Sequence, residues 1–432
     1  MAQEQRSSAQ PMKTEVFNEI EAFEQLGQEW DSLLDESDQQ NFFLRAEWNR
    51  LWWIHHAPPG TRLYLITCRN QNGELTGIAP LYWRQHCFLG IPHSRELLFL
   101  GMGIALKTSE FTDLIARRGD EQAVATAFAS CLHQRKDWDR IWLWQVPRES
   151  SMLRHFTNTL GEPTKIETCD RAPYIDTSAT WPAYKASLGR SMRRNTEYYS
   201  RRLFKRYNCE FNDVNNAQEL ESAMHALIRL HQARWQSQGE QGIFSNSSVV
   251  DFLCASVQHS FPHGRLRLWT LKINGTIEAA LLGFLDNGVL HYFQKGFNPA
   301  YASEDLGTAM LALCIRASFD DPAIKAFDFM GGGATYKEMW ARSSRETLAC
   351  QTHKLNARTV AFQLHKCIKS CTACIYRTIA PTKLRLVRAQ WLRRKKLRKN
   401  DPLLSALVIF TWAFEPTQQA TFEFLQTAIT YA

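Results

Sequence analysis

The sequence has no long apolar run and no apolar segment near its start. The stretch Leu403 to Phe414 is nearly all apolar but has only twelve residues, whereas a membrane-spanning helix needs about 20. Met1 to Met12 is polar and lacks the apolar core of a secretion signal. We therefore expect no spanning helix in that stretch and a cytoplasmic protein.

The eleven cysteines have no regular spacing of the kind found in small disulfide scaffolds, which favours a reducing compartment. Cys367, Cys371 and Cys374 have the spacing that holds an iron–sulfur cluster in radical enzymes. On a helix, the same spacing places three small residues on one face, and no barrel pattern surrounds them. We therefore favour packing and expect no metal.

Acidic residues are absent from His365 to Asn400, which contains twelve Lys and Arg. Since the whole chain carries a formal charge of +8, the remainder carries −4. This segment and the apolar stretch after it predict a basic helical tail over 356–432. The tail could dock on an anionic membrane surface or a protein partner, which we favour; RNA binding or a plain solvated face are the alternatives.

The second half of the chain contains a sequence of strands and turns that leads into a helix. Period-2 alternation predicts a first strand, and the dipeptide Asn274-Gly275 predicts a hairpin turn after it. A glycine run precedes a short last helix. The expected elements are strands at Leu266 to Lys272, Ile277 to Leu285 and Val289 to Phe297, a helix at Leu306 to Phe319, a strand at Ala323 to Met330, and a short helix with Tyr336 and Lys337. Gly296 and Asn298-Pro299 predict a bulge or an abrupt end in the third strand.

The start of the predicted helix at Leu306 is suited to an anion. Its backbone N–H groups point outward at the positive end of the helix dipole, and Gly307 and Thr308 are small enough to let a diphosphate approach. This order of elements resembles the GNAT N-acyltransferase superfamily, in which two diverging parallel strands take the pantetheine arm of an acyl-CoA.

The resemblance is narrower in a few motifs. Tyr292 to Gly296, Gly307-Thr308, Phe327-Asp328-Phe329, Gly332, and Tyr336-Lys337 with Trp340 look like the CelD-like acetyltransferases, a bacterial family often associated with polysaccharide synthesis. That family is similar to the Fem-type transferases, which take amino acids from aminoacyl-tRNA. The sequence departs from the family at Asp305-Leu306, where Ser-Pro is common, and at Gly333-Ala334, where acidic residues are frequent.

The first half repeats this order of elements. We expect a helix at Glu15 to Leu34 and a second helix or helical turn at Phe42 to Trp53. Strands at Leu63 to Arg69, Leu75 to Gln85 and Leu97 to Gly101, a helix at Glu121 to Gln134 and a strand at Arg140 to Gln145 should follow. The prediction is an α/β protein of tandem GNAT-like lobes, with mixed sheets, flanking helices and a helical basic extension. We expect a disordered N-terminus (1–14), an N-terminal lobe (15–165), a C-terminal acyltransferase lobe (166–355) and the tail (356–432).

A strand at Cys169 to Asp176 and an arginine-rich helix at Trp181 to Asn208 are expected to open the second lobe. Arg193 and Arg194 match an Arg-Arg-Asn pattern of the family and could clamp a phosphate or an anionic acceptor. An ordinary solvated helix face explains them equally well. A further helix is expected at Leu220 to Gln238, in which we interpret His231 as a core or capping histidine rather than a catalytic one.

The resemblance implies a role for each candidate residue of the site. Backbone N–H groups of Phe293, Gln294 and Lys295 would hold the thioester carbonyl, and Gly307 and Thr308 the diphosphate. Tyr336 would protonate the leaving thiolate, Lys337 would supply positive charge, and Asp328 would orient Lys337 or take the amine proton. Because neighbouring residues on a strand alternate, Tyr292 rather than His291 is expected to face the cleft and the acceptor.

These features predict an enzyme that transfers an acyl group from acyl-CoA, with acetyl-CoA as the expected co-substrate, to a small-molecule or glycan-linked amine in polysaccharide or cell-envelope synthesis. A Fem-type transferase that uses aminoacyl-tRNA and a non-catalytic scaffold of a membrane-associated assembly are the alternatives.

Overall fold

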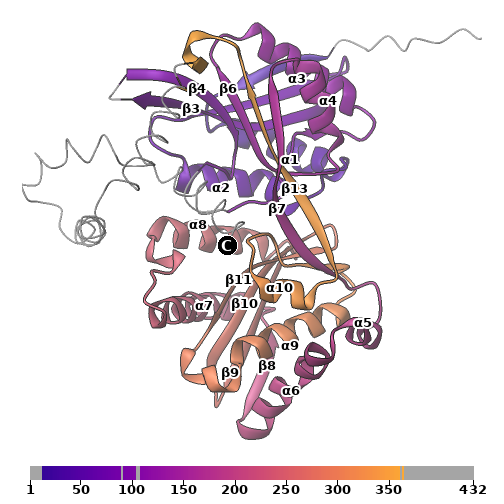
Figure 1. The fold of residues 1–432 in the computed structure, drawn as a ribbon, viewed down its shortest axis with the longest axis vertical. Coiled ribbons are helices and arrows are strands. Elements are labelled where there is room, and N and C mark those ends of the chain that lie inside the picture. The colour runs from indigo at the N-terminus through magenta and orange to yellow at the C-terminus, as the bar shows by residue number, and fades with distance from the viewer. Residues whose placement is uncertain (1–11, 89–90, 104–107, 361, 364–432) are drawn as a thin grey trace, which may run out of the picture.

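The computed structural model describes residues 12–88, 91–103, 108–360 and 362–363. They form two lobes, one above the other in Figure 1. The first lobe contains β1 (Lys13–Phe17), α1 (Ala22–Asp35), η1 (Phe42–Leu44), α2 (Ala46–His56), β2 (Arg62–Arg69), β3 (Leu75–Phe88), β4 (Ile91–Phe99), β5 (Ile115–Ala116), α3 (Glu121–Gln134), β6 (Arg140–Pro147), α4 (Ser151–Leu160) and β7 (Thr164–Asp176).

The second lobe repeats this order after two helices of its own. It contains α5 (Trp181–Ser187), α6 (Arg190–Arg206), β8 (Cys209–Asp213), α7 (Ala217–Ser237), η2 (Ile243–Ser245), α8 (Ser247–Ser260), β9 (Leu266–Ile273), β10 (Thr276–Asp286), β11 (Val289–Phe297), η3 (Pro299–Glu304), α9 (Leu306–Asp320), β12 (Ala326–Asp328), α10 (Thr335–Trp340) and β13 (Ser343–His353). The predicted α/β fold of tandem lobes is confirmed.

A single mixed sheet passes through both lobes. Over the described residues its strand order is β1-β2-β3-β4-β6-β13-β7-β12-β11-β10-β9-β8, with β5 paired to β3. The lobes exchange strands at its centre. β7 is the last element of the first lobe but pairs with β12 of the second, and β13 is the last element of the second lobe but pairs with β6 of the first. Figure 1 shows β7 and β13 running together between the lobes.

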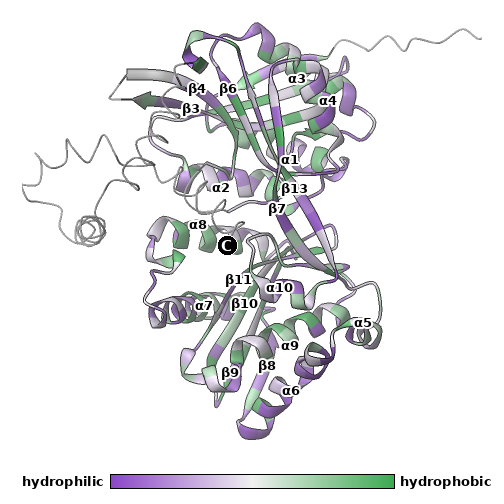
Figure 2. Ribbon diagram, in the orientation of Figure 1, coloured by the Kyte–Doolittle hydropathy of each residue, from purple (hydrophilic) through white to green (hydrophobic). Residues whose placement is uncertain are grey.

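One cluster of buried hydrophobic residues contains side chains of both lobes, beside further clusters centred in each lobe. Phe42 of η1 stacks on Phe284 of β10, with ring centroids 4.4 Å apart. Beside this stack, the Arg45 guanidinium donates to both carboxylate oxygens of Asp286, at 2.6 and 2.9 Å. Figure 2 shows the complementary pattern, in which hydrophilic colours cover α6 and much of the β7–β13 pair. The two lobes therefore pack against each other through this common cluster.

Two Asn-Gly turns connect the strands of the second lobe, the first of them predicted from the sequence. Asn274-Gly275 and Asn287-Gly288 have positive φ angles (51° and 84°, 43° and 75°) and connect β9 to β10 and β10 to β11. Asparagine and glycine tolerate this left-handed backbone, which matches the twist of a hairpin. The three-stranded meander is therefore confirmed, with β11 ending where the sequence analysis placed it.

Three predicted boundaries are wrong. The helix expected from Glu15 begins only at Ala22, because Lys13–Phe17 pairs with β2 as a strand. The helix expected from Trp181 to Asn208 is broken at Leu188 and Gly189, whose backbone is extended. The strand expected from Ala323 to Met330 is only Ala326–Asp328, since a turn at Asp321 and a positive φ at Met330 carry its flanks out of the sheet.

Strand β13 was not expected from the sequence. The predicted domain boundaries stay predictions. The described residues do not include residues 1–11 of the expected disordered N-terminus, most of the tail, or the three cysteines of the tail. No helix in the described part of the chain is long and apolar enough to cross a membrane.

Candidate functional site

Strands β11 and β12 diverge. They pair in parallel only where Val289 to His291 face Ala326 to Asp328. β12 ends there, while β11 continues to Phe297 without a second described strand on that edge. Leu282 of β10 faces Gln294 and the next residue, Gly283, faces Tyr292, so Phe293 is the extra residue of a bulge. The bulge lies three residues before Gly296, where it was expected. It changes the direction of the side chains of β11 next to the gap between β11 and β12.

A cavity of about 220 Å³ lies where the strands part. Its walls come from β11, from the segment after β12, from η2 and α8, and from the first lobe. The lining residues are Thr108, Glu110, Ile243, Phe244, Val249, Phe252, Leu253, Tyr292, Phe293, Gln294, Phe329, Met330, Gly331 and Lys337. Of the predicted site residues, Tyr292, Phe293, Gln294 and Lys337 line this cavity together, and His291 is not in its lining.

The backbone from Phe329 to Gly331 is held by charged side chains. The Lys337 ammonium donates to the carbonyl oxygens of Phe329, Met330 and Gly331, at 2.8, 3.1 and 2.6 Å. The Gly331 N–H donates to both oxygens of Glu110, at 2.9 and 2.7 Å. Because an ammonium has three donors, these bonds show that Lys337 shapes the segment; its charge reaches the cavity from that wall.

Asp328 lies behind the cavity rather than in its lining. It is fully buried, accepts a hydrogen bond from the Met330 N–H at 2.7 Å and pairs with Arg345. Burial raises the pKa of its carboxyl to about 6, although the Arg345 charge opposes this. Asp328 is therefore bonded to Met330 and Arg345, and the arrangement lets it act on the cavity through the Met330 backbone.

Lys295 and two tyrosines gather on the α9 side of β11. The Lys295 ammonium donates to the Gly307 carbonyl at 3.1 Å and lies 5.6 Å from the centre of the Tyr336 ring. Burial lowers the pKa of Lys295 to about 8. Burial and the neighbouring Tyr336 raise the pKa of the Tyr292 phenol, whereas Tyr336 itself is 38% exposed. Tyr336 is thus the accessible phenol of the pair, as a proton donor requires.

The start of α9 approaches β11 closely. A Cβ on Gly307 would lie 2.7 Å from the Phe297 ring, so only glycine permits this contact. Thr308 and Ala309 donate their N–H groups to the Asp305 carbonyl, and Asp305 has the left-handed conformation. The carboxylate of Asp305 is half-exposed at the predicted phosphate seat, 4.0 Å from Arg202.

The structure does not bring Arg193 and Arg194 to the cavity. Arg193 donates to the carbonyls of Ala186 and Leu188, where α5 ends, and neither arginine is in the lining. His231 is a core histidine, since it is buried and accepts a hydrogen bond from Trp235, and burial lowers its pKa to about 4.

Sequence reasoning missed Thr108 and Glu110. Glu110 contacts a residue 221 positions later in the chain, and no local pattern marks such a pairing. Both belong to the first lobe, so the cavity of the second lobe is complete only when the first lobe is folded against it.

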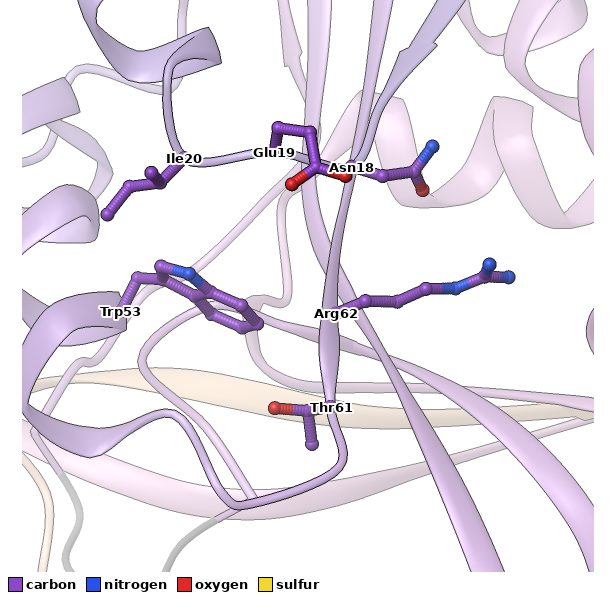
Figure 3. A pocket seen from close by; sticks show the side chains of 6 residues that line it. All are labelled: Asn18, Glu19, Ile20, Trp53, Thr61 and Arg62. Carbon is purple, nitrogen blue, oxygen red and sulfur yellow. The ribbon is translucent and has the colours of Figure 1, made fainter.

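A wider surface hollow of about 520 Å³ lies in the first lobe, lined by Asn18, Glu19, Ile20, Trp53, Thr61 and Arg62. Figure 3 shows the Arg62 side chain pointing away from Trp53. Its guanidinium instead covers the Trp83 ring and pairs with Asp137. Within the described ranges no group of three or more His, Cys, Asp or Glu is placed to hold a metal. Of the two hollows, the cavity between the diverging strands β11 and β12 is the better candidate for the functional site.

Known proteins support this assignment of the fold. Residues 190–338 match the family model described as an acetyltransferase (GNAT) domain. The second lobe carries a GNAT-type domain. No curated protein sequence matches the chain.

Solved structures resemble the chain over both lobes. The crystal structure of FemX is 10% identical and covers 78% of this chain and 98% of its own, with a TM-score of 0.56. The C-terminal domain of a putative lysylphosphatidylglycerol synthetase from Agrobacterium fabrum is 9% identical over 79% and 95%, with a TM-score of 0.48. A tandem GNAT protein from the clavulanic acid biosynthesis pathway is 9% identical over 79% and 98%, with a TM-score of 0.41. At 10% identity, the similarity to FemX shows that the two proteins have the same fold.

Proposed function

We propose that the protein is an N-acyltransferase that moves an acyl group from acyl-CoA to an amine bound in the cavity of the second lobe. The observation that carries the proposal is the divergence of β11 and β12 at a bulge, beside a cavity and within the segment that matches the GNAT domain. In that superfamily such a gap takes the pantetheine arm, which would bring the thioester to Phe293 and Gln294.

The chemistry needs alignment, a donor for the oxyanion and two proton transfers. The amine nitrogen forms a bond to the acyl carbon and the carbon–sulfur bond breaks. The amine loses a proton to a base and the departing thiolate gains one. We assign the oxyanion contact to the backbone at the Phe293 bulge and protonation of the thiolate to the accessible Tyr336. Lys337 and Asp328 stabilise the wall of the cavity at Phe329 to Gly331 through hydrogen bonds to its backbone.

A Fem-type reaction is the second candidate. The two-lobed fold matches FemX along 98% of that chain, and Fem-type transferases take the acyl group from aminoacyl-tRNA. In that case an ester rather than a thioester would be cleaved. The CelD-like motifs favour acyl-CoA and a place in polysaccharide or cell-envelope synthesis, so we keep acyl-CoA as the first choice.

The experiment offers both donors to the same protein. Acetyl-CoA, a longer acyl-CoA and a mixture of aminoacyl-tRNAs, each with a labelled acyl group, are incubated with the protein and a panel of primary amines, and products are identified by mass spectrometry. Labelled amide from acyl-CoA supports the proposal, and labelled amide only from aminoacyl-tRNA replaces it with the Fem-type reaction. If neither donor binds, the protein is a scaffold with a transferase fold.

The membrane proposal for the basic tail is separate. We propose that the twelve Lys and Arg between His365 and Asn400 attract anionic lipid. Sedimentation with vesicles that contain phosphatidylglycerol, at low and high salt, tests it. Binding at low salt that falls at high salt is expected, and equal sedimentation with neutral vesicles would contradict it.

A further inference from the structure

Positive groups gather on the α9 side of β11 without an acid to balance them. Lys295 is 8% exposed, and its ammonium lies 5.7 Å from the centre of the Phe297 ring and 5.6 Å from that of Tyr336. The guanidinium carbon of Arg234, from α7, lies 5.1 Å from the same Phe297 ring. In the described part of the chain no carboxylate forms an ion pair with Lys295 or Arg234. Two cations therefore lie at one ring without a counter-charge.

The bulge of β11 places Lys295 on the same side as Tyr292. Leu281 of β10 faces Lys295 and Gly283 faces Tyr292, and residues two apart on a strand point to the same side of a sheet. Tyr292 and Lys295 therefore share a side, although a regular strand turns residues three apart to opposite sides. The extra residue, Phe293, thus marks the gap beside β12 and also brings Lys295 to the phenols.

A buried cation without a partner is costly to the folded protein, because the ammonium leaves water and no acid compensates for it. The Lys295 ammonium donates to the Gly307 carbonyl at 3.1 Å, and an ammonium has three donors. A neutral carbonyl does not balance the charge. The arrangement therefore suits a negative charge that develops nearby during the reaction.

Such a charge develops on the sulfur of the donor. When the carbon–sulfur bond breaks, its electron pair stays on sulfur and the Tyr336 proton follows it. The phenolate then takes up a proton from solvent, which has received the proton that the amine loses. We propose that Lys295, together with Arg234, stabilises the leaving thiolate and the phenolate of Tyr336 by positive charge, and so is a positioning residue of the reaction. The inference rests on the proposed acyl-CoA function and deepens it, because it names the groups that recognise the leaving sulfur.

The first test follows the ionisation of the leaving group. CoA and desulfo-CoA, in which hydrogen replaces the thiol group, are each added to the full-length protein at pH 7, and the difference between their ultraviolet spectra measures the thiolate. An unperturbed thiol, with a pKa of about 8.5, is only a few per cent ionised at this pH. Binding should raise the ionised share at least about tenfold, since a nearby opposite charge favours an ionised group by that factor or more. CoA that stays a thiol when bound would overturn the proposal.

Variants locate the charge. Lys295→Met and Arg234→Met should each lower the thiolate signal, and Lys295→Arg, which keeps the charge, should retain part of it. Because Lys295→Met removes an unbalanced buried cation, its melting temperature should not fall. Arg229→Met changes an exposed arginine of α7 and should leave the signal unchanged. A signal that survives both methionine variants, or a lower melting temperature in Lys295→Met, would contradict the proposal.

The pH dependence of turnover gives a second reading. The groups that face Lys295 are Arg234 of α7, Cys314 of α9, Tyr336 of α10 and Tyr292 of its own strand. Burial and Arg234 lower the pKa of Lys295 to about 8, while Cys314 opposes this. Since the ammonium is the working form, turnover should fall as the pH rises through about 8. Lys295→Arg should lack this fall, and Arg234→Met should move it to higher pH because a like charge is gone. The same fall in all three proteins would contradict the proposal.

Failure of this inference can be told from failure of the proposed function. Transfer from acyl-CoA that is independent of Lys295 and Arg234 would refute the inference and leave the transferase. A thiolate signal that depends on both residues, without transfer to any amine, would support the inference and refute the transferase proposal. If CoA does not bind, both are refuted.

Discussion

The two lobes have the same order of elements but treat the gap after their parallel strands differently. In the second lobe β11 continues past the end of β12, and the gap forms the cavity. In the first lobe β4 and β6 pair in parallel between Glu96 to Leu98 and Arg140 to Trp142. There, residues 108–116 occupy the space beyond: the Thr112 hydroxyl donates to the Trp144 carbonyl of β6, and β5 pairs with β3.

This difference indicates a division of roles. The segment that closes the gap of the first lobe also carries Thr108 and Glu110 to the cavity of the second. One copy of the repeat thus keeps an open site, and the other contributes a wall to it. Because the lobes exchange β7 and β13, this wall is fixed in register with the site.

The largest expected effect comes from separating the lobes. Arg45→Ala leaves the Asp286 carboxylate buried without its guanidinium, which should lower the free energy of unfolding by about 3–5 kcal/mol. Arg50→Ala, in the helix α2 that Arg45 precedes, removes a partly exposed pair with Glu47 and should cost less than about 1 kcal/mol. Urea denaturation followed by tryptophan fluorescence measures both. Equal effects would show that the lobes do not depend on this contact.

A pH dependence should reveal the closed gap of the first lobe. Burial raises the pKa of Asp113 to about 7, above the roughly 3.9 of an unfolded chain. The contribution of the neutral carboxyl is therefore complete below pH 4 and lost as the pH rises through 7, by up to about 4 kcal/mol. Asp113→Asn should remove this part of the stability profile, and Asp38→Asn, at an exposed carboxylate, should not. An unchanged profile in Asp113→Asn would contradict the raised pKa.

The wall of the open gap can be weakened directly. Lys337→Met removes three hydrogen bonds to the backbone of Phe329 to Gly331. Turnover should fall about 10- to 1000-fold, on the scale of a lost oxyanion donor, and unfolding should become easier by about 1–3 kcal/mol. Lys325→Met, at an exposed lysine of the same lobe, is the control. Full activity in Lys337→Met would show that this wall has no part in the reaction.

Local patterns predicted what local interactions determine. Asn274-Gly275 and Asn287-Gly288 specify the turns of the meander. The glycine run at Gly331 to Gly333 indicated the segment after β12 that lines the cavity. β13 was missed because only Thr347, Cys350 and Thr352 along it are buried, and its partner β6 lies about two hundred residues earlier. The same distance hid Glu110. The roles of Arg193 and Arg194 were inferred from a family pattern and from their charge, and neither shows that Arg193 closes the break after α5.

The central claim is that each chain binds one acyl-CoA, with its diphosphate at the start of α9 in the second lobe. Titration with acetyl-CoA and a longer acyl-CoA should give one site per chain. Thr308→Glu places a negative charge at the third residue of α9, where it should repel a diphosphate and weaken binding at least about 10-fold, while a helix start tolerates the charge. Ala123→Glu makes the same change at the third residue of α3 in the first lobe and should leave affinity unchanged. Two sites per chain, or weakening by Ala123→Glu rather than Thr308→Glu, would contradict the account.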